Sequence, residues 1–172
     1  QLLQALDSID DIDECSLFVN QVISDQITVT GAKFRTVVVP VGRKRVFPAN
    51  QLYFARNRSW RRLDLLHSPV SVAPLLAPAK TVLTVHDLAY EVFPAHYSKK
   101  AILYWRIALR KACKNASRVI ADSECTKKDL MTYMNILGDD IRVVYPFVSA
   151  SYKEEPASTA FPAAAAAAVA TA

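Results

Sequence analysis

The chain has 172 residues, a formal net charge of +5 and a hydrophobic fraction of 52%, which is enough for one domain with a sizeable core. No apolar run approaches the roughly 20 residues of a membrane-spanning helix, and the amphipathic, acidic N-terminus does not match a secretory signal peptide. Three cysteines, Cys15, Cys113 and Cys125, fit neither a zinc pattern nor a disulfide framework. We therefore expect reduced thiols, no metal site and a cytoplasmic protein.

The first forty residues predict one helix followed by strands. Residues 1–9 carry apolar side chains at helical spacing, and residues 15–19, 27–30 and 33–39 are typical of strands. A doubly wound α/β domain normally opens with a strand and a glycine-containing turn before its first helix. Neither precedes Gln1, so we expect that segment to be missing from this chain, and no glycine-rich phosphate loop occurs elsewhere.

A basic segment follows, because residues 26–63 contain no acidic side chain and nine basic ones. Pro48 opens a predicted helix that ends near Arg62, and its mixture of arginines and aromatic residues suits a helix on a membrane surface or one packed on a sheet. The charge is either a solvated basic face or a surface for an anionic partner, such as a phosphorylated ligand or an acidic membrane. No nucleic-acid-binding motif accompanies it. The residues proposed for the anionic surface are Arg43, Lys44, Arg45, Arg56, Arg58, Arg61 and Arg62.

Three short apolar runs rich in β-branched residues alternate with two helical patterns over residues 81–146. Such runs suit strands buried on both faces, and helices between them imply βαβ crossovers and a parallel sheet. We therefore predict a Rossmann-like, doubly wound α/β fold with a mostly parallel sheet. Residues 82–85, 119–121 and 142–144 should be neighbouring strands, with helices over both faces. A shorter strand is predicted at residues 63–68.

The helices of this stretch have recognisable caps. Ser98 is a good N-cap for a helix that ends near Asn115, and Ser123 for a helix that Gly138 ends. Residues 87–97 are too long for a plain connector and predict a functional loop. The residues expected to face the core are Ile102, Trp105, Ile107, Leu109, Ala112, Cys113, Leu130, Met131 and Met134.

Polar residues end two of these strands, and ligands of open α/β sheets bind at the carboxyl ends of the strands. His86 follows the first strand, where its imidazole suits a hydrogen bond to a ligand or, alternatively, to nearby backbone. Asp87 suits the orientation of His86 or the start of a turn, and the turn is favoured. Ser123 and Glu124 follow the next strand, and both suit ligand binding as well as helix capping.

Several motifs share the order and spacing of one enzyme family. The first reads Thr84-Val85-His86-Asp87-Leu88-Ala89, with Phe93-Pro94 and Tyr97-Ser98 beyond it, the second runs from Ala116 to Leu130, and the third from Ile141 to Pro146. Together they resemble the N-terminal domain of the group 1 glycosyltransferases, family four, which have the GT-B fold. The resemblance covers Gln1 to about Tyr152.

The resemblance implies that residues 1–152 are the acceptor-side half of a retaining transferase. Such enzymes move a sugar from a nucleotide-sugar donor to a glycan or lipid-linked acceptor, as in polysaccharide biosynthesis, without a metal or another cofactor. It implies a catalytic role for His86 near the transferred sugar and substrate-binding roles for Asp87, Ser123 and Glu124. We expect the C-terminal donor-binding domain to lie outside this chain and the chain alone to be inactive, with residues 153–172 as a linker and alanine-rich tail.

Two other functions stay open. The main alternative is a non-catalytic α/β module that binds an anionic surface or partner. A different Rossmann-like enzyme, such as a dehydrogenase, is disfavoured because the glycine fingerprint is missing. The expected location is cytoplasmic, with peripheral contact to the anionic inner face of a membrane as a further expectation and no nucleic-acid partner.

Overall fold

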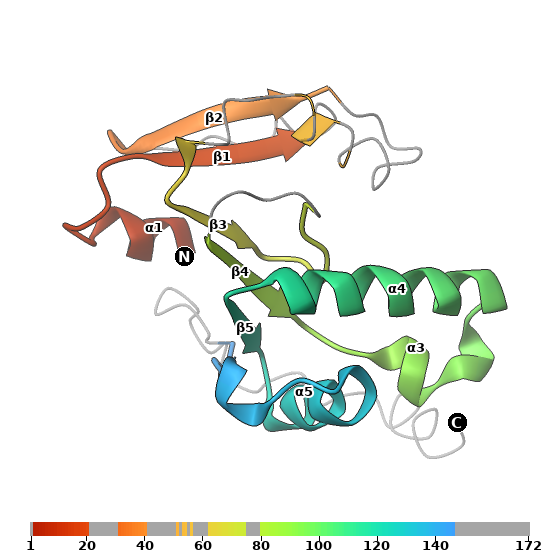
Figure 1. Cartoon of the computed structure of the whole chain (residues 1–172). Coiled ribbons are helices and arrows are strands. Elements are labelled where there is room, and N and C mark those ends of the chain that lie inside the picture. The colour runs from red at the N-terminus through yellow and green to blue at the C-terminus, as the bar shows by residue number, and fades with distance from the viewer. Residues whose placement is uncertain are drawn as a thin grey trace, which may run out of the picture.

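The computed structural model describes residues 2–20, 31–40, 51, 53, 54, 56, 62–74 and 80–146. Helix α1 (Leu2–Asp7) leads into the parallel pair of strands β1 (Cys15–Asn20) and β2 (Phe34–Val39). Figure 1 shows this pair lying apart from the other strands. The strand predicted at residues 27–30 lies outside the described residues.

The predicted helix of the basic segment is described only in part. Gln51, Tyr53, Phe54 and Arg56 are helical, and the other residues between 48 and 61 lie outside the described residues. The aromatic ring of Phe54 contacts the ring of Phe18 on β1, with 5.4 Å between their centroids. This contact indicates that the helix packs one of its aromatic residues against the β1–β2 pair.

The second sheet carries the predicted central strands. It consists of β3 (Leu65–Ser68), β4 (Lys80–Val85), β5 (Arg118–Ala121) and β6 (Ile141–Val143), in that order and all parallel. The prediction of three neighbouring parallel strands is confirmed, with β6 shifted by one residue. Because all these strands run in the same direction, their carboxyl ends meet at one edge of the sheet.

The described strands form two separate sheets, because β1 and β3 belong to different ones. Every strand pair in both sheets is parallel. The arrangement therefore has the parallel α/β character that the sequence predicts.

Helices occupy the β4–β5 and β5–β6 connections of the second sheet. The predicted loop over residues 87–97 contains the short helix α3 (Ala89–Val92) and the 3₁₀ turn η3 (Pro94–His96). Helix α4 (Lys99–Asn115) then leads back to β5, and helix α5 (Glu124–Asp129) continues as the π-helical turn η4 (Leu130–Met134). The 3₁₀ turn η5 (Gly138–Asp140) precedes β6.

Both predicted N-caps are confirmed. The Ser98 hydroxyl accepts a hydrogen bond from the Ala101 backbone N–H at 3.2 Å, and the Ser123 hydroxyl accepts one from that of Thr126 at 3.1 Å. The predicted stop at Gly138 is wrong. Asn135 ends η4 in the left-handed conformation, with a φ of 57°, because its short polar side chain tolerates that conformation better than most residues do.

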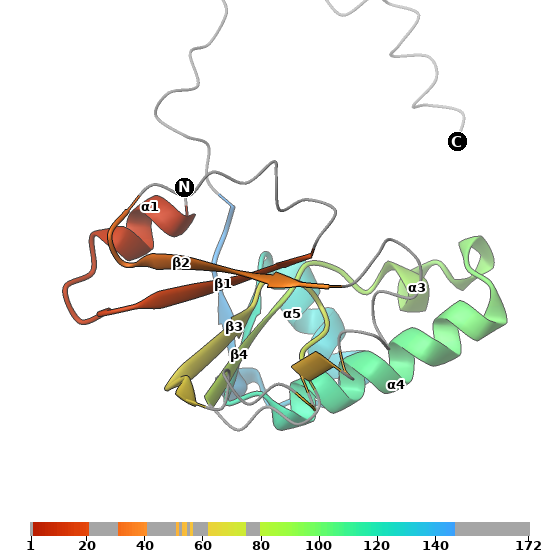
Figure 2. The ribbon, with the colours of Figure 1, turned by 90° about the horizontal axis from the view of Figure 1, so that it is seen from above.

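The core lies on one face of the second sheet. Along β4, Leu83 and Val85 are buried, while Val82 and Thr84, which alternate with them, are only half-buried. Side chains of α4 and of the α5–η4 segment pack on the same cluster as the buried residues of β4, β5 and β6. Figure 2 shows the sheet with α4 along its outside. The core cluster comprises Ala73, Leu83, Val85, Leu88, Tyr90, Leu109, Ala112, Cys113, Val119, Ala121, Leu130, Met134 and Ile141.

The expectation that helices cover both faces is therefore not met by α4 and α5. Each crossover moves one strand further in the same direction, and right-handed crossovers in one direction place their helices on the same face. The expectation of a core position is also wrong for two residues, because Ile107 and Met131 are 54% and 45% exposed. Cys113 is buried as predicted, and burial raises the pKa of its thiol to about 12.

Candidate active site at the strand tips

His86 lies at the carboxyl end of β4 and joins three strand ends. Its Nε2 atom is 2.9 Å from the backbone oxygen of Pro69, which follows β3, and its Nδ1 atom is 3.3 Å from Oδ2 of Asp122, which follows β5. The His86 side chain is still 54% exposed. The ring is thus oriented by contacts on both nitrogens and open to a ligand.

The chemistry of this ring follows from its partners. A carbonyl oxygen and a carboxylate both accept hydrogen bonds, and a neutral imidazole has one N–H to donate. If Nδ1–H donates to Asp122, Nε2 carries the lone pair and accepts a hydrogen bond from a ligand hydroxyl. If Nε2–H donates to Pro69, that nitrogen cannot accept. A neutral His86 ring can therefore donate to only one of these two neighbours at a time, and Nε2 can accept from a ligand only in the form whose Nδ1–H donates to Asp122.

Thr126 links the ends of β4 and β5 through its side-chain hydroxyl. Its hydroxyl oxygen is 2.9 Å from the backbone oxygen of His86, 3.1 Å from Oδ1 of Asp122 and 2.9 Å from the Ser123 hydroxyl. Thr126 is only 5% exposed. A buried hydroxyl with three polar neighbours holds the β4 and β5 tips in a fixed relation.

The remaining predicted residues lie at the same tips but make local contacts. The Asp87 carboxylate accepts a hydrogen bond from the Ala89 N–H at 2.9 Å, which begins α3 and confirms the favoured turn. Ser123 caps α5, and Glu124 is exposed in its first turn, where a negative charge is favourable. All four predicted residues therefore lie at neighbouring strand tips.

Asp122 belongs to the polar end of the second predicted strand, but the sequence reasoning assigned it no role in the site. Val85 pairs with Ala121 in the β4–β5 register, so the next residues, His86 and Asp122, lie opposite each other. The signal was present in the sequence, because both predicted strands end on a small or branched apolar residue followed by a polar one. Aligning those ends would have identified the pair.

The segment after His86 is anchored to α4. Arg106 of α4 donates from Nε and Nη2 to the carboxylate of Glu91, at distances from 2.6 to 3.0 Å, and the Glu91 side chain is 5% exposed. The hydrogen bonds and charge of Glu91 raise the pKa of Arg106. Next to this pair, the ring of Tyr90 stacks on Trp105. These contacts fix the segment of residues 87–97, which was predicted as a loop.

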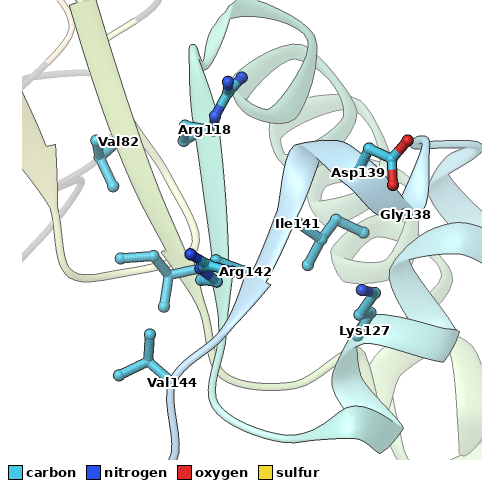
Figure 3. Close-up of a pocket in the computed structure, with 9 residues that line it drawn as sticks. Val82, Arg118, Lys127, Gly138, Asp139, Ile141, Arg142 and Val144 are labelled. Carbon is cyan, nitrogen blue, oxygen red and sulfur yellow. The ribbon is translucent and has the colours of Figure 1, made fainter.

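A hollow of about 630 Å³ lies away from these tips, along β6. Figure 3 shows Val82, Arg118 and Arg142 on one side of this strand and Lys127 and Ile141 on the other. None of the predicted catalytic or substrate-binding residues lines it. The residues that line the hollow lie on both faces of β6, an outer strand of the described sheet. The hollow therefore follows the edge of the sheet and does not bring these residues together into one site.

The predicted basic surface is described at only two positions. Arg56 and Arg62 are exposed, and Arg43, Lys44, Arg45, Arg58 and Arg61 lie outside the described residues. The basic surface therefore stays a prediction. Within the described residues no group of three or more His, Cys, Asp or Glu side chains is placed to hold a metal ion, and no described helix is long and apolar enough to cross a membrane.

The comparison with known families decides how these tips are interpreted. The family model for Glycosyltransferase Family 4 matches residues 17–152, which include both strand tips. The chain belongs to glycosyltransferase family 4. This finding confirms the resemblance drawn from the motifs, and the parallel α/β fold agrees with the Rossmann-like N-terminal half of a GT-B enzyme. No curated protein matches the chain.

Proposed function

We propose that this family 4 domain is the acceptor-binding half of a retaining glycosyltransferase. The transferase would move a sugar from a nucleotide-sugar donor to a glycan or a lipid-linked acceptor, without a metal or another cofactor. The observation that carries the proposal is the half-exposed His86 ring, held at the β4 tip by Pro69 and Asp122. Family membership and the usual ligand position of parallel α/β sheets support it.

In this proposal His86 is the catalytic residue of the domain. A hydroxyl of the sugar or of the acceptor would replace the Pro69 oxygen as the partner of Nε2. The ring would keep its orientation, because Nδ1 stays bonded to Asp122. A residue that accepts a hydroxyl hydrogen bond at the reacting centre contributes through position and through the charge that develops in the transition state.

Asp87, Ser123 and Glu124 have supporting roles in this proposal. Asp87 sets the local backbone through its turn, and Ser123 through its helix cap. Glu124 is exposed at the β5 tip, where its carboxylate is available to sugar hydroxyls. We expect the 172-residue chain alone to transfer no sugar, because the sequence motifs of the donor-binding half are not among its residues.

The test is substitution of His86 in an active transferase that contains this domain. We expect His86→Ala to lower the rate of sugar transfer on the order of a hundredfold while thermal unfolding stays unchanged, since the side chain is half exposed. His96→Ala is the matched control, because His96 is an exposed histidine on η3. Near wild-type transfer by His86→Ala, or an equal loss in His96→Ala, would show that His86 is structural.

A further inference from the structure

Packing within the fold does not explain the apolar side chains on the outward face of α4. Leu103 and Ile107 are 60% and 54% exposed, although they lie in the middle of the longest helix that the structure describes. The opposite face of α4 already supplies the core with Ala108, Leu109 and Ala112. The exposed aliphatic side chains therefore form a second apolar surface on the same helix.

Basic residues flank this apolar centre at both ends. At 100° per residue, positions 100, 103, 107, 111 and 114 fall on one side of the helix. The stripe thus reads Lys100, Leu103, Ile107, Lys111 and Lys114, and each of its side chains is exposed. We call these five residues the α4 stripe. Figure 2 shows α4 along the outside of the molecule.

The charged side chains of α4 are all positive. Its sequence has no acidic residue, and within the described residues the ion pair made by α4 is that of Arg106 with Glu91. Lys99 and Lys100 lie in the first turn, where a positive charge opposes the helix dipole. The helix dipole therefore does not account for Lys99 and Lys100, whereas it is favourable for Lys114 in the last turn.

We propose that the α4 stripe binds the surface of an anionic lipid bilayer. The aliphatic centre would enter the boundary between headgroups and acyl chains, and the lysines would extend to the anionic headgroups. A second copy of this chain is disfavoured as the occupant, because two stripes of the same charge repel each other. A purely acidic partner would explain the lysines but not Leu103 and Ile107.

The proposal differs from the expectation for the basic segment of residues 43–62. It rests on a different element, whose residues are described, and it does not depend on the proposed enzymatic function. Vesicle binding would be measured without any sugar substrate. Loss of transferase activity and loss of membrane binding can therefore be told apart.

The experiment is flotation of the full chain with vesicles of phosphatidylcholine alone and of phosphatidylcholine with 30% phosphatidylglycerol. We expect binding to the anionic vesicles only, and release at about 0.5 M salt, where the Debye length falls to a few ångström. Leu103→Gln/Ile107→Gln should weaken binding about tenfold, because it removes the apolar contact. Lys111→Glu/Lys114→Glu should weaken it at least about tenfold, since each basic residue near the surface is worth about fivefold.

The matched control is Lys128→Glu/Leu137→Gln, which changes an exposed lysine and a 73% exposed leucine away from α4. It should bind as the wild type does, and circular dichroism should show that every variant is folded. Unchanged binding by both α4 variants would overturn the proposal. So would equal binding to neutral vesicles, no binding at all, or binding that only Arg58→Glu/Arg62→Glu abolishes. Binding to heparin without vesicle binding would also overturn it and would indicate an acidic polymer as the partner.

Discussion

The tips of β4 and β5 lie side by side but differ in what they offer. The β4 tip presents His86, whose side chain is 54% exposed. The β5 tip leads into Thr126, which is 5% exposed and contacts the backbone oxygen of His86 and the carboxylate of Asp122. One tip presents an exposed ring, and the other supports the strand end that carries this ring from the interior.

In the candidate site, one tip can contact a ligand, and the other holds the contacting residue in place. An exposed histidine on a loop would sample many orientations, and ordering it would cost side-chain entropy when a ligand binds. Here Asp122 and Pro69 orient the ring beforehand, and Thr126 connects the strands that carry them. Substitution of His86 should therefore affect activity, substitution of the buried Thr126 should affect stability, and substitution of Asp122 should affect activity through the orientation of His86.

The largest effect on stability is expected at Thr126. Thr126→Val keeps the shape of the side chain but leaves the His86 carbonyl and Asp122 facing a methyl group. We expect the free energy of unfolding to fall by about 1–3 kcal/mol, the usual cost of a buried polar group without its partner. Urea denaturation measures it. Thr132→Val is the control, because the exposed Thr132 hydroxyl donates only to the Lys128 oxygen. Equal losses in both variants would contradict the supporting role.

A smaller loss of stability is expected when the N-cap residues of α4 and α5 are replaced. Ser98→Ala removes one capping bond from α4, and replacing an N-cap serine by alanine typically costs about 1 kcal/mol. Ser123→Ala should cost more than Ser98→Ala, because the Ser123 hydroxyl also contacts the buried Thr126 hydroxyl. The two variants can be compared by urea denaturation under identical conditions. A smaller loss for Ser123→Ala would mean that the β5 tip is less tightly connected than its contacts indicate.

The smallest effect on stability is expected at His67, a histidine within β3. Its Nε2 is 3.0 Å from the Thr84 hydroxyl, and burial lowers its pKa. As the pH falls below about 6.5, the ordinary histidine pKa, the unfolded chain takes up the proton before the folded chain does. Stability should therefore decrease between pH 7.5 and 5.5. His67→Gln should lose less stability over this range. An identical pH dependence in the two proteins would exclude the contribution of His67.

Much of the second sheet follows from local patterns. The strands β4, β5 and β6 are short β-branched runs between turn signals, and Ser98 and Ser123 are capping residues placed directly before helical patterns. Such features depend on neighbours in the sequence. This locality explains why the strand tips, and with them His86, could be predicted without coordinates.

The errors arise where distant residues decide the outcome. Asp122 is a site residue only because the β4–β5 register places it opposite His86. Ile107 has the helical spacing of a core residue, yet it is exposed because the sheet covers only one side of α4. The helix after β5 ends at Asn135 in a left-handed conformation, although Gly138 is the stronger stop signal in the sequence. Register and layer packing are not visible in a local pattern.

The most direct test of the account is a double-mutant cycle between the two tips, in an active transferase that contains this domain. Asp122→Asn should lower the rate of transfer about tenfold, because an amide can donate to Nδ1 and so favours the imidazole form that cannot accept at Nε2. In the His86→Ala background the same substitution should have almost no further effect on the rate. Independent losses that multiply in the double variant would contradict the claim that Asp122 acts through His86.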